Sequence, residues 1–145
     1  LGYVSDADAD AIDYTVMPLE ALWWADDMDD FEQARKDKWK WTAMIMQPSI
    51  VTVKALKAAK AELGRKKKVL PAMDLVRIQD MTEGPCAQVL HTGPYADEGP
   101  TIAKLHAFSR SKGKVMRGWH REIYLSDARR SAPEKLRTII RQPFC

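Results

Sequence analysis

The sequence of 145 residues predicts an α+β domain, and the order of its elements carries this prediction. Its second half reads as strand, helix, strand, strand, because β-prone runs flank one helical segment. The first half shows two strands in tandem before a helix, as though the same unit had lost its opening strand and helix. The chain is long enough for one compact domain with a hydrophobic core.

The first half contains three β-prone stretches and one clear helix. One strand is predicted from Ile12 to Met17, which Pro18 breaks before Leu19–Trp24 continues in extended form, and a second strand at Trp39–Met46. From Thr52, an alanine- and lysine-rich stretch with apolar residues at helical spacing predicts a helix that ends at Gly64.

The second half begins with two β-prone runs, Val76–Met81 and Cys86–Thr92, around the turn residues 82–85, a pattern that predicts a hairpin. A helix is predicted from Pro100 to Gly113, because proline favours the first turn and glycine closes a helix. Two further strands are predicted, over Trp119–Leu125 and Leu136–Gln142.

The composition argues against several classes of protein. Lys and Arg total 23 against 20 Asp and Glu, and much of the excess lies in Arg65–Lys68, which is typical of a solvated helix end, so we do not expect nucleic-acid binding. No apolar run approaches the ~18 residues that span a bilayer, and no signal peptide opens the chain, so a cytoplasmic protein with no membrane partner is predicted. With only Cys86 and Cys145, neither a disulfide framework nor a thiolate metal site is expected.

The run Asp26–Asp30 contains four carboxylates and is predicted to be an exposed acidic loop or the start of a short helix. It lacks the turn glycine and closing glutamate of a calcium loop. His120 and Glu122 form a His-x-Glu pattern, but the downstream Pro-Cys-x-x-Cys of a zinc deaminase is missing. The other histidines have no partner at ligand spacing. We therefore expect no metal and no cofactor.

The most informative segment is His120–Asp127, in which His120, Glu122 and Tyr124 occupy every second position. Side chains alternate between the faces of a strand, so these three residues share one face. That face is predicted to carry the chemistry, because a half-buried carboxylate is costly unless something polar, cationic or reactive meets it. The opposite face is predicted to be core and consists of Trp119, Arg121, Ile123 and Leu125.

Each member of this polar row has an ordinary interpretation as well. Glu122 is as readily a strand carboxylate that faces water or pairs with an arginine. Tyr124 is as readily an ordinary sheet residue as a hydrogen-bond donor to a ligand. A lone strand histidine is more often packed than catalytic, so His120 is assigned a supporting role.

Five tryptophans are many for a chain of 145 residues. Trp39 and Trp41 share one face of a predicted strand and offer rings against which a planar or cationic ligand can stack. Core filling is nevertheless the commoner role for any single tryptophan. Met44 and Met46 fit an adaptable ligand lining, with ordinary core packing as the alternative.

Four motifs follow one another along the chain: Pro18–Trp23, Trp41–Pro48, Leu90–Tyr95 and His120–Asp127. Together with the tail at 132–143, they resemble the GyrI-like small-molecule-binding family. The resemblance covers nearly the whole chain from about Tyr14 onward.

The resemblance implies two strand-helix-strand-strand modules whose strands form an antiparallel sheet around a central ligand cleft. In one domain over 1–145, residues 12–48 would be the remainder of the first module, 49–74 a connecting helix and linker, and 75–145 the second module. No candidate for an opening strand and helix precedes Asp13, so the first module is expected to be incomplete at its N-terminus. Either the chain is a fragment or a neighbouring copy supplies an edge, as in a homodimer.

The resemblance also implies roles for individual residues. Glu122 would lie in the cleft, where burial among aromatic rings raises its pKa and makes it a general base or a counter-charge for a cationic drug. Tyr124 is paired with it as the second predicted catalytic residue. The residues predicted to bind the ligand are Trp23, Trp41, Met44, Tyr95 and His120.

Members of the family serve as effector domains of multidrug-responsive regulators, as stand-alone binders related to a gyrase-inhibitory protein, and as hydrolases of DNA-alkylating cyclopropanoid toxins. This sequence most resembles the stand-alone branch. The leading hypothesis is a protein that binds planar hydrophobic or cationic small molecules and detoxifies electrophilic cyclopropanoids by hydrolysis. The alternative is a non-catalytic sensor or sequestering domain, and a weaker third hypothesis is a protein that acts on gyrase.

Overall fold

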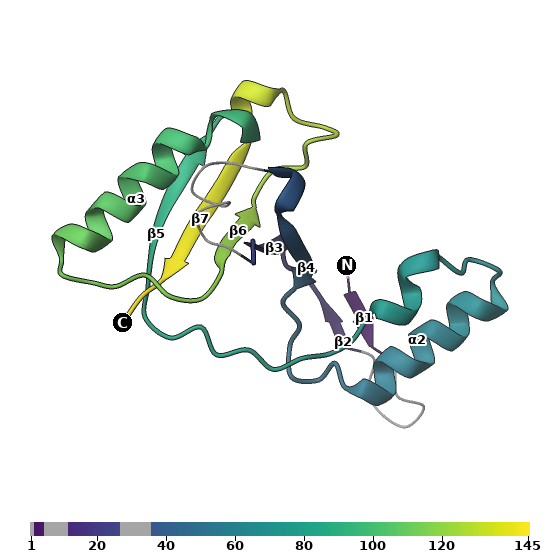
Figure 1. Cartoon of the computed structure of the whole chain (residues 1–145). Coiled ribbons are helices and arrows are strands. Elements are labelled where there is room, and N and C mark those ends of the chain that lie inside the picture. Colours follow the sequence, from purple (N-terminus) through teal and green to yellow (C-terminus); the bar gives the residue numbers. More distant parts are fainter. Residues whose placement is uncertain (1, 5–11, 27–35) are drawn as a thin grey trace. The chain divides into compact units, whose positions relative to one another are not determined.

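The computed structural model describes residues 2–4, 12–26 and 36–145, which fold as two compact units (Figure 1). The acidic loop predicted at Asp26–Asp30 lies, apart from Asp26, outside the described residues. None of the helices within these ranges is long and apolar enough to cross a membrane.

The first compact unit comprises Leu1–Met17 and Met46–Thr82. Strands β1 (Gly2–Val4) and β2 (Ile12–Tyr14) pair antiparallel in this unit. A strand therefore precedes Asp13, contrary to the expectation from the sequence. Three residues are too few to leave a period-two pattern, so local sequence does not reveal this strand.

Helix α2 (Val53–Arg65) also belongs to the first unit and begins where the sequence predicts. The Thr52 hydroxyl accepts a hydrogen bond from the Ala55 backbone N–H at 3.2 Å, which caps the first turn. The helix runs one residue past Gly64, and a short 3₁₀ helix (Pro71–Leu75) follows it.

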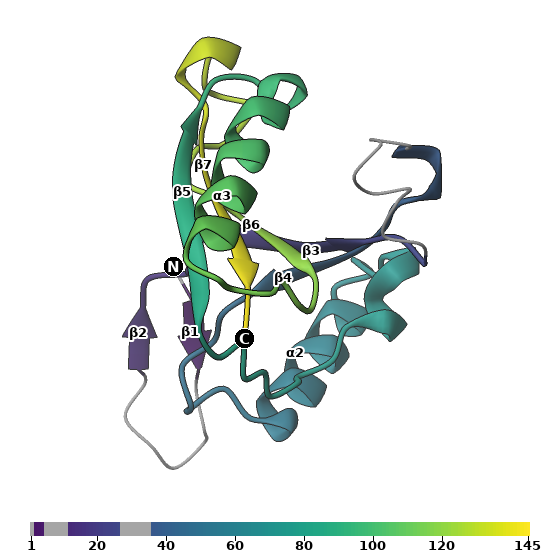
Figure 2. The same cartoon turned by 60° about the vertical axis from the view of Figure 1, so that its left-hand side comes forward.

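The second compact unit, Pro18–Ile45 and Glu83–Cys145, contains a five-stranded antiparallel sheet on which helix α3 (Gly99–Ser111) packs (Figures 1 and 2). This architecture confirms the predicted α+β fold. In spatial order, the strands are β4 (Lys40–Ile45), β3 (Leu19–Trp24), β6 (His120–Tyr124), β7 (Arg137–Pro143) and β5 (Cys86–Thr92).

The sheet brings the two halves of the chain together at the pair β3–β6. Leu19 lies opposite Tyr124, and Trp23 lies opposite His120 in the antiparallel register. Residues directly opposite each other in such a pair point to the same face. A strand from the first half therefore lies beside the polar row of the second half.

The predicted hairpin between Val76–Met81 and Cys86–Thr92 is wrong. Residues 76–81 form no strand, and β5 pairs with β7 instead, with Cys86 opposite Pro143 and Thr92 opposite Arg137. A β-prone run becomes a strand only where another strand offers its backbone groups for pairing, and Val76–Met81 has no such neighbour among the described residues.

Helix α3 packs on β5 and β7, and the hydrophobic core lies between them (Figure 2). Ile140 is fully buried there, together with Leu105 of the helix. Because Glu122 lies opposite Ile140, the polar row and this core share one face of the sheet. The prediction that core and chemistry occupy opposite faces of β6 is thus corrected: Arg121, assigned to the core, lies in an ionic network on the other face.

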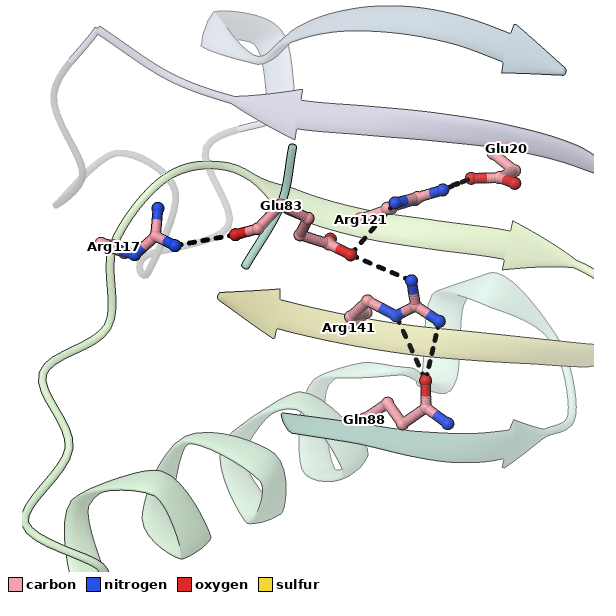
Figure 3. Close-up of polar contacts among 6 residues, drawn as sticks. All are labelled: Glu20, Glu83, Gln88, Arg117, Arg121 and Arg141. Atoms are coloured by element: carbon pink, nitrogen blue, oxygen red, sulfur yellow. Dashed lines mark hydrogen bonds and ion pairs between the residues drawn. The ribbon is translucent and has the colours of Figure 1, made fainter. Parts of the chain in front are cut away.

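We call this ionic network the arginine network; Figure 3 shows it. Arg121 Nε donates to Glu20 Oε2 at 2.7 Å, and the guanidinium groups of Arg121 and Arg141 both donate to Glu83 Oε2, at 3.1 and 2.9 Å. Glu20 and Arg121 are buried. Arg141 also donates twice to the Gln88 side-chain oxygen, at 3.1 and 2.9 Å, so the network ties together β3, β6, β7 and β5.

Gly84 allows Arg117 to lie close to the backbone just before β5. Arg117 Nη2 donates to the Glu83 backbone oxygen at 2.7 Å, as Figure 3 shows. Gly84 has a φ of 74°, and a Cβ added there would lie 2.6 Å from Arg117 Nη2. Only glycine combines this backbone conformation with the close approach of the arginine.

Candidate functional site

The side chains of the polar row point to the face of the sheet that α3 covers in part. His120 and Glu122 are 2% and 7% exposed, and Tyr124 is half-buried. Strand alternation and the short span of β6 place the three side chains side by side, as the sequence pattern predicts.

A chain of hydrogen bonds orients the Glu122 carboxyl group. The Trp23 indole N–H donates to the Tyr124 hydroxyl at 3.1 Å, and that hydroxyl donates to Glu122 Oε2 at 2.6 Å. The other oxygen, Oε1, lies 3.3 Å from Nε2 of His120. Both carboxyl oxygens of Glu122 are therefore in contact with side chains of β6, and Trp23 of β3 orients the Tyr124 hydroxyl.

These contacts reverse the expected direction of the Glu122 pKa. Burial is the largest single influence and by itself would raise the pKa, as the sequence predicts. Hydrogen bonds from His120 and Tyr124, together with the charge of His120, outweigh burial, so the pKa of Glu122 is lowered. Glu122 is therefore a carboxylate at neutral pH.

Tyr124 serves this carboxylate as a donor. Burial raises the pKa of Tyr124, and the hydrogen bond to the Glu122 carboxylate raises it further, because an ionised phenol could not donate. The hydroxyl consequently keeps its proton over the whole physiological range.

Tyr95 and Glu98 approach the row from the segment before α3. The ring of Tyr95, in the short 3₁₀ helix Tyr95–Asp97, contacts the ring of Tyr124 edge-on at 5.6 Å between centroids. Burial and the charges of Glu98 and Glu122 raise the pKa of Tyr95. Glu98 is 6% exposed, and its side chain contributes to lowering the pKa of Glu122.

Glu98 was missed in the sequence. It lies outside any alternating or helical pattern, at the N-cap position of α3, where a glutamate reads as an ordinary helix-end carboxylate. Its only sequence signal is its place three residues after Tyr95, at the end of one of the motifs that carry the family resemblance.

Three tryptophans continue this face toward the edge of the sheet, and we call them the aromatic surface: Trp23, Trp39 and Trp41. The ring centroid of Trp23 lies 6.0 Å from that of Trp39 and 6.5 Å from that of Trp41. Trp23 is opposite both His120 and Trp41 in the register, so the surface and the polar row face the same way. Trp41 is 61% exposed and is open to a ligand.

The other tryptophans lie apart from this set. Trp24 stacks on Trp119 at 4.4 Å between centroids, and alternation along β3 directs it to the face opposite Trp23. The sequence favours Trp23 and Trp41 over Trp39, whereas the structure brings Trp39 into contact with Trp23.

Met44 does not join the predicted ligand-binding residues. It lies opposite Glu20 in the register and therefore on the face of the arginine network. Trp41 and Met44 are three residues apart in one strand, so alternation sends them to opposite faces. The predicted set thus divides: Trp23, Trp41, Tyr95, His120, Glu122 and Tyr124 come together, and Met44 does not.

A neighbouring histidine has a structural position. His91 Nδ1 lies 3.0 Å from the Thr101 hydroxyl of α3, and Nε2 lies 3.3 Å from the Pro94 backbone oxygen. Within the described ranges, no three His, Cys, Asp or Glu side chains are grouped as metal ligands.

Removing the Tyr124 hydroxyl is expected to change how stability depends on pH. Because the pKa of Glu122 is lower in the folded than in the unfolded chain, its ionised form stabilises the fold fully above the unfolded pKa. This stabilisation is lost as the pH falls through the folded pKa. We expect Tyr124→Phe to be about 1.5–3 kcal/mol less stable at neutral pH. The difference should shrink on acidification, as measured by urea unfolding over a pH series.

Tyr14→Phe is the matched control, since the Tyr14 hydroxyl donates to the Gln47 side chain at 2.9 Å in an exposed contact. Its small effect on stability should not vary with pH. A Tyr124→Phe deficit that is equal at neutral and acid pH would show that the hydroxyl does not stabilise an ionised Glu122.

Comparisons with known proteins identify the family of the chain. The model of the GyrI-like small molecule binding domain matches residues 5–143. No curated protein sequence matches the chain at a significant level.

Solved structures from Listeria innocua resemble the chain throughout its length. A hydrolase is 34% identical with a TM-score of 0.81, and the alignment covers 98% of this chain and 68% of that one. An uncharacterized conserved protein is 39% identical with a TM-score of 0.76, covering 92% and 66%. A further hydrolase structure is 35% identical with a TM-score of 0.77, covering 92% and 65%.

The chain thus spans about two thirds of the length of these proteins, 65–68%. Identity above 30% over most of the chain and a family match over 5–143 establish common descent. The chain belongs to the GyrI-like family of small-molecule-binding domains.

Proposed function

We propose that the chain binds planar, hydrophobic or cationic small molecules on the aromatic surface beside Glu122. One observation carries this proposal: a buried carboxylate with a lowered pKa lies on the same face as the exposed ring of Trp41. The faces of tryptophan rings attract cations and stack on flat ligands. The carboxylate supplies the matching negative charge.

We also propose that bound electrophiles are hydrolysed with Glu122 as general base. In a cyclopropanoid, the oxygen of water would bond to the ring methylene while a ring carbon–carbon bond breaks and its electron pair moves to the conjugated carbonyl. The water proton would pass to Glu122, and the carbonyl oxygen would take up a proton to give a phenol. A carboxylate with a lowered pKa is a weak base, which suits an electrophile already activated by ring strain. The similarity to a hydrolase from Listeria innocua supports this proposal.

A non-catalytic sensor or sequestering domain is the second candidate. The observation that favours it is again the lowered pKa of Glu122, because a permanent carboxylate is a good counter-charge and a poor base. In that case, the same residues would bind the ligand and no product would form.

Two measurements test the proposal. A planar cation such as proflavine should quench the tryptophan fluorescence on binding, and Trp41→Ala should weaken this binding at least about tenfold because the stacking face is lost. Trp119→Ala is the matched control, since Trp119 stacks on Trp24 and lies apart from the aromatic surface. Equal affinity in both variants would refute binding at this surface.

The second measurement is the mass of a cyclopropanoid after incubation with the protein. A product heavier by one water molecule, formed faster than in buffer, would establish hydrolysis. Binding without this product would favour the sensor.

A further inference from the structure

The direction of each proton in the polar row follows from what its groups can donate and accept. The Trp23 indole nitrogen can only donate, and it donates to the Tyr124 hydroxyl at 3.1 Å. A carboxylate can only accept, so that hydroxyl gives its single proton to Glu122 Oε2 at 2.6 Å. The chain of hydrogen bonds therefore runs one way, from β3 to the carboxylate on β6.

This direction leaves Glu122 and Tyr124 with acceptors alone. A tyrosine hydroxyl has two lone pairs besides its proton, and Trp23 occupies one of them; a carboxylate offers about four lone-pair sites. Any further donor to Glu122 would occupy another of these sites and would leave no proton for a ligand. Both ring nitrogens of His120 are buried, so this residue presents no N–H outward either.

Trp23 places these lone pairs at the border of the aromatic surface. Its N–H belongs to the chain of hydrogen bonds, while its ring centroid lies 6.0 Å from that of Trp39 and 6.5 Å from that of Trp41. Tyr124 is half-buried and Glu122 is 7% exposed. A flat ligand stacked on the rings therefore meets the two acceptors at its edge.

We infer that Glu122 and Tyr124 select ligands by their hydrogen-bond donors, so that the aromatic surface prefers planar compounds with N–H or O–H groups at one edge. This inference rests on the proposed function and names its ligand class. A ligand carbonyl beside Glu122 would lose its hydrogen bonds to water and face only lone pairs, which is costly. Tyr124 is accordingly no donor to a ligand oxygen. An attacking water molecule is itself a donor and fits the same site.

The first experiment compares two planar monocations built on the same three rings. Proflavine carries N–H groups at its edge, whereas 10-methylacridine orange carries methyl groups in their place and has no N–H. We expect the wild-type chain to bind proflavine at least about tenfold more tightly, the effect of hydrogen bonds to a charged acceptor. Quenching of tryptophan fluorescence measures both affinities.

A variant separates hydrogen bonding from the size of the methyl groups. Glutamine puts an amide donor where the carboxylate has an acceptor, so Glu122→Gln should lower the ratio of the two affinities several-fold. A general loss of binding cancels in this ratio. Trp119→Ala, which removes a ring outside the aromatic surface, should keep the wild-type ratio. The Tyr95 hydroxyl is present in every protein compared and does not affect the differences.

The direction of the protons is tested without a ligand. The five tryptophans give five indole N–H signals in a ¹⁵N spectrum, and the signal of Trp23 is the one missing in Trp23→Phe. We expect Tyr124→Phe to move this signal, because the indole loses its acceptor. Glu122→Gln should move it too, since a hydroxyl that no longer donates to an anion accepts more weakly. The Trp119 signal should move in neither variant.

Equal binding of the two dyes by the wild-type chain would overturn the inference, and so would a ratio that Glu122→Gln leaves unchanged. A Trp23 signal that Tyr124→Phe does not move would overturn it whether or not a dye binds. Failure of the proposed function looks different: neither dye binds, while the Trp23 signal responds to both variants. The ligand class would then fall with the function, and the direction of the protons would stand.

Discussion

Replacing Glu122 with glutamine is expected to slow the hydrolysis of a cyclopropanoid by about 10²–10⁴-fold, the range that general base catalysis contributes. Glutamine has the same shape, and its amide oxygen can still accept the Tyr124 hydroxyl proton. It cannot take a proton from the attacking water. The measurement is the rate of water-adduct formation, with the variant and the wild-type chain saturated with substrate.

Glu134→Gln is the control for this prediction, because Glu134 is an exposed glutamate in the short 3₁₀ helix Pro133–Lys135. It should react at the wild-type rate. If Glu122→Gln also kept the wild-type rate, the catalysed step would not depend on this carboxylate, and the hydrolysis proposal would fail.

Glu122→Gln also distinguishes a general base at position 122 from a residue that serves only as a counter-charge for a cationic ligand. Under the sensor hypothesis, the wild-type chain forms no adduct, and Glu122→Gln weakens the binding of proflavine because the negative charge is gone. A neutral planar ligand of similar size should bind nearly equally to both proteins. A loss of affinity for cationic and neutral ligands alike would indicate a disturbed aromatic surface rather than a lost charge.

The polar row could be predicted from sequence because its pattern is local. His120, Glu122 and Tyr124 are two residues apart, and a strand must place them on one face. Helices α2 and α3 and the five described strands of the main sheet are also local patterns, and their bounds lie within one or two residues of those predicted. Trp23 and Trp41 were found because they lie in motifs shared with the family.

The partners of the row could not be predicted, because they are distant in sequence. Trp23 and Tyr124 are 101 residues apart, as are Glu20 and Arg121. Such contacts depend on the register of β3 against β6, which no single segment encodes. The direction of the Glu122 pKa was mispredicted for another reason: the sequence places His120 and Tyr124 beside Glu122 but does not show that their hydrogen bonds outweigh burial.

The arginine network shows the same limit on the other face of the sheet. Arg121 lies between two residues of the polar row, and its position in the strand predicts a core side chain. The structure instead surrounds it with two carboxylates, Glu20 from β3 and Glu83 from the residues before β5 (Figure 3). Charge pairing across distant segments converts an expected apolar position into an ionic one.

Arg121→Met is accordingly expected to lower the free energy of unfolding by about 3–5 kcal/mol, the usual effect of removing one partner from a buried ion pair. Methionine replaces much of the volume, so the loss comes from charge rather than from a cavity. Glu83 keeps Arg141 as a partner, whereas Glu20 is 4% exposed and would stay buried without its guanidinium. Urea unfolding at neutral pH measures the effect.

Two further variants show whether the unpaired Glu20 carboxylate causes the loss of stability in Arg121→Met. The double variant Glu20→Met, Arg121→Met removes both charges and should recover most of the lost stability, because an apolar pair of similar volume often replaces a buried ion pair without loss. Arg129→Met breaks the pair with Asp127, in which the Arg129 side chain is 88% exposed, and should change stability little, because solvent screens such a pair. If the double variant were as unstable as Arg121→Met alone, the arginine would stabilise the sheet by packing across β3 and β6, and the charge of Glu20 would not be the reason.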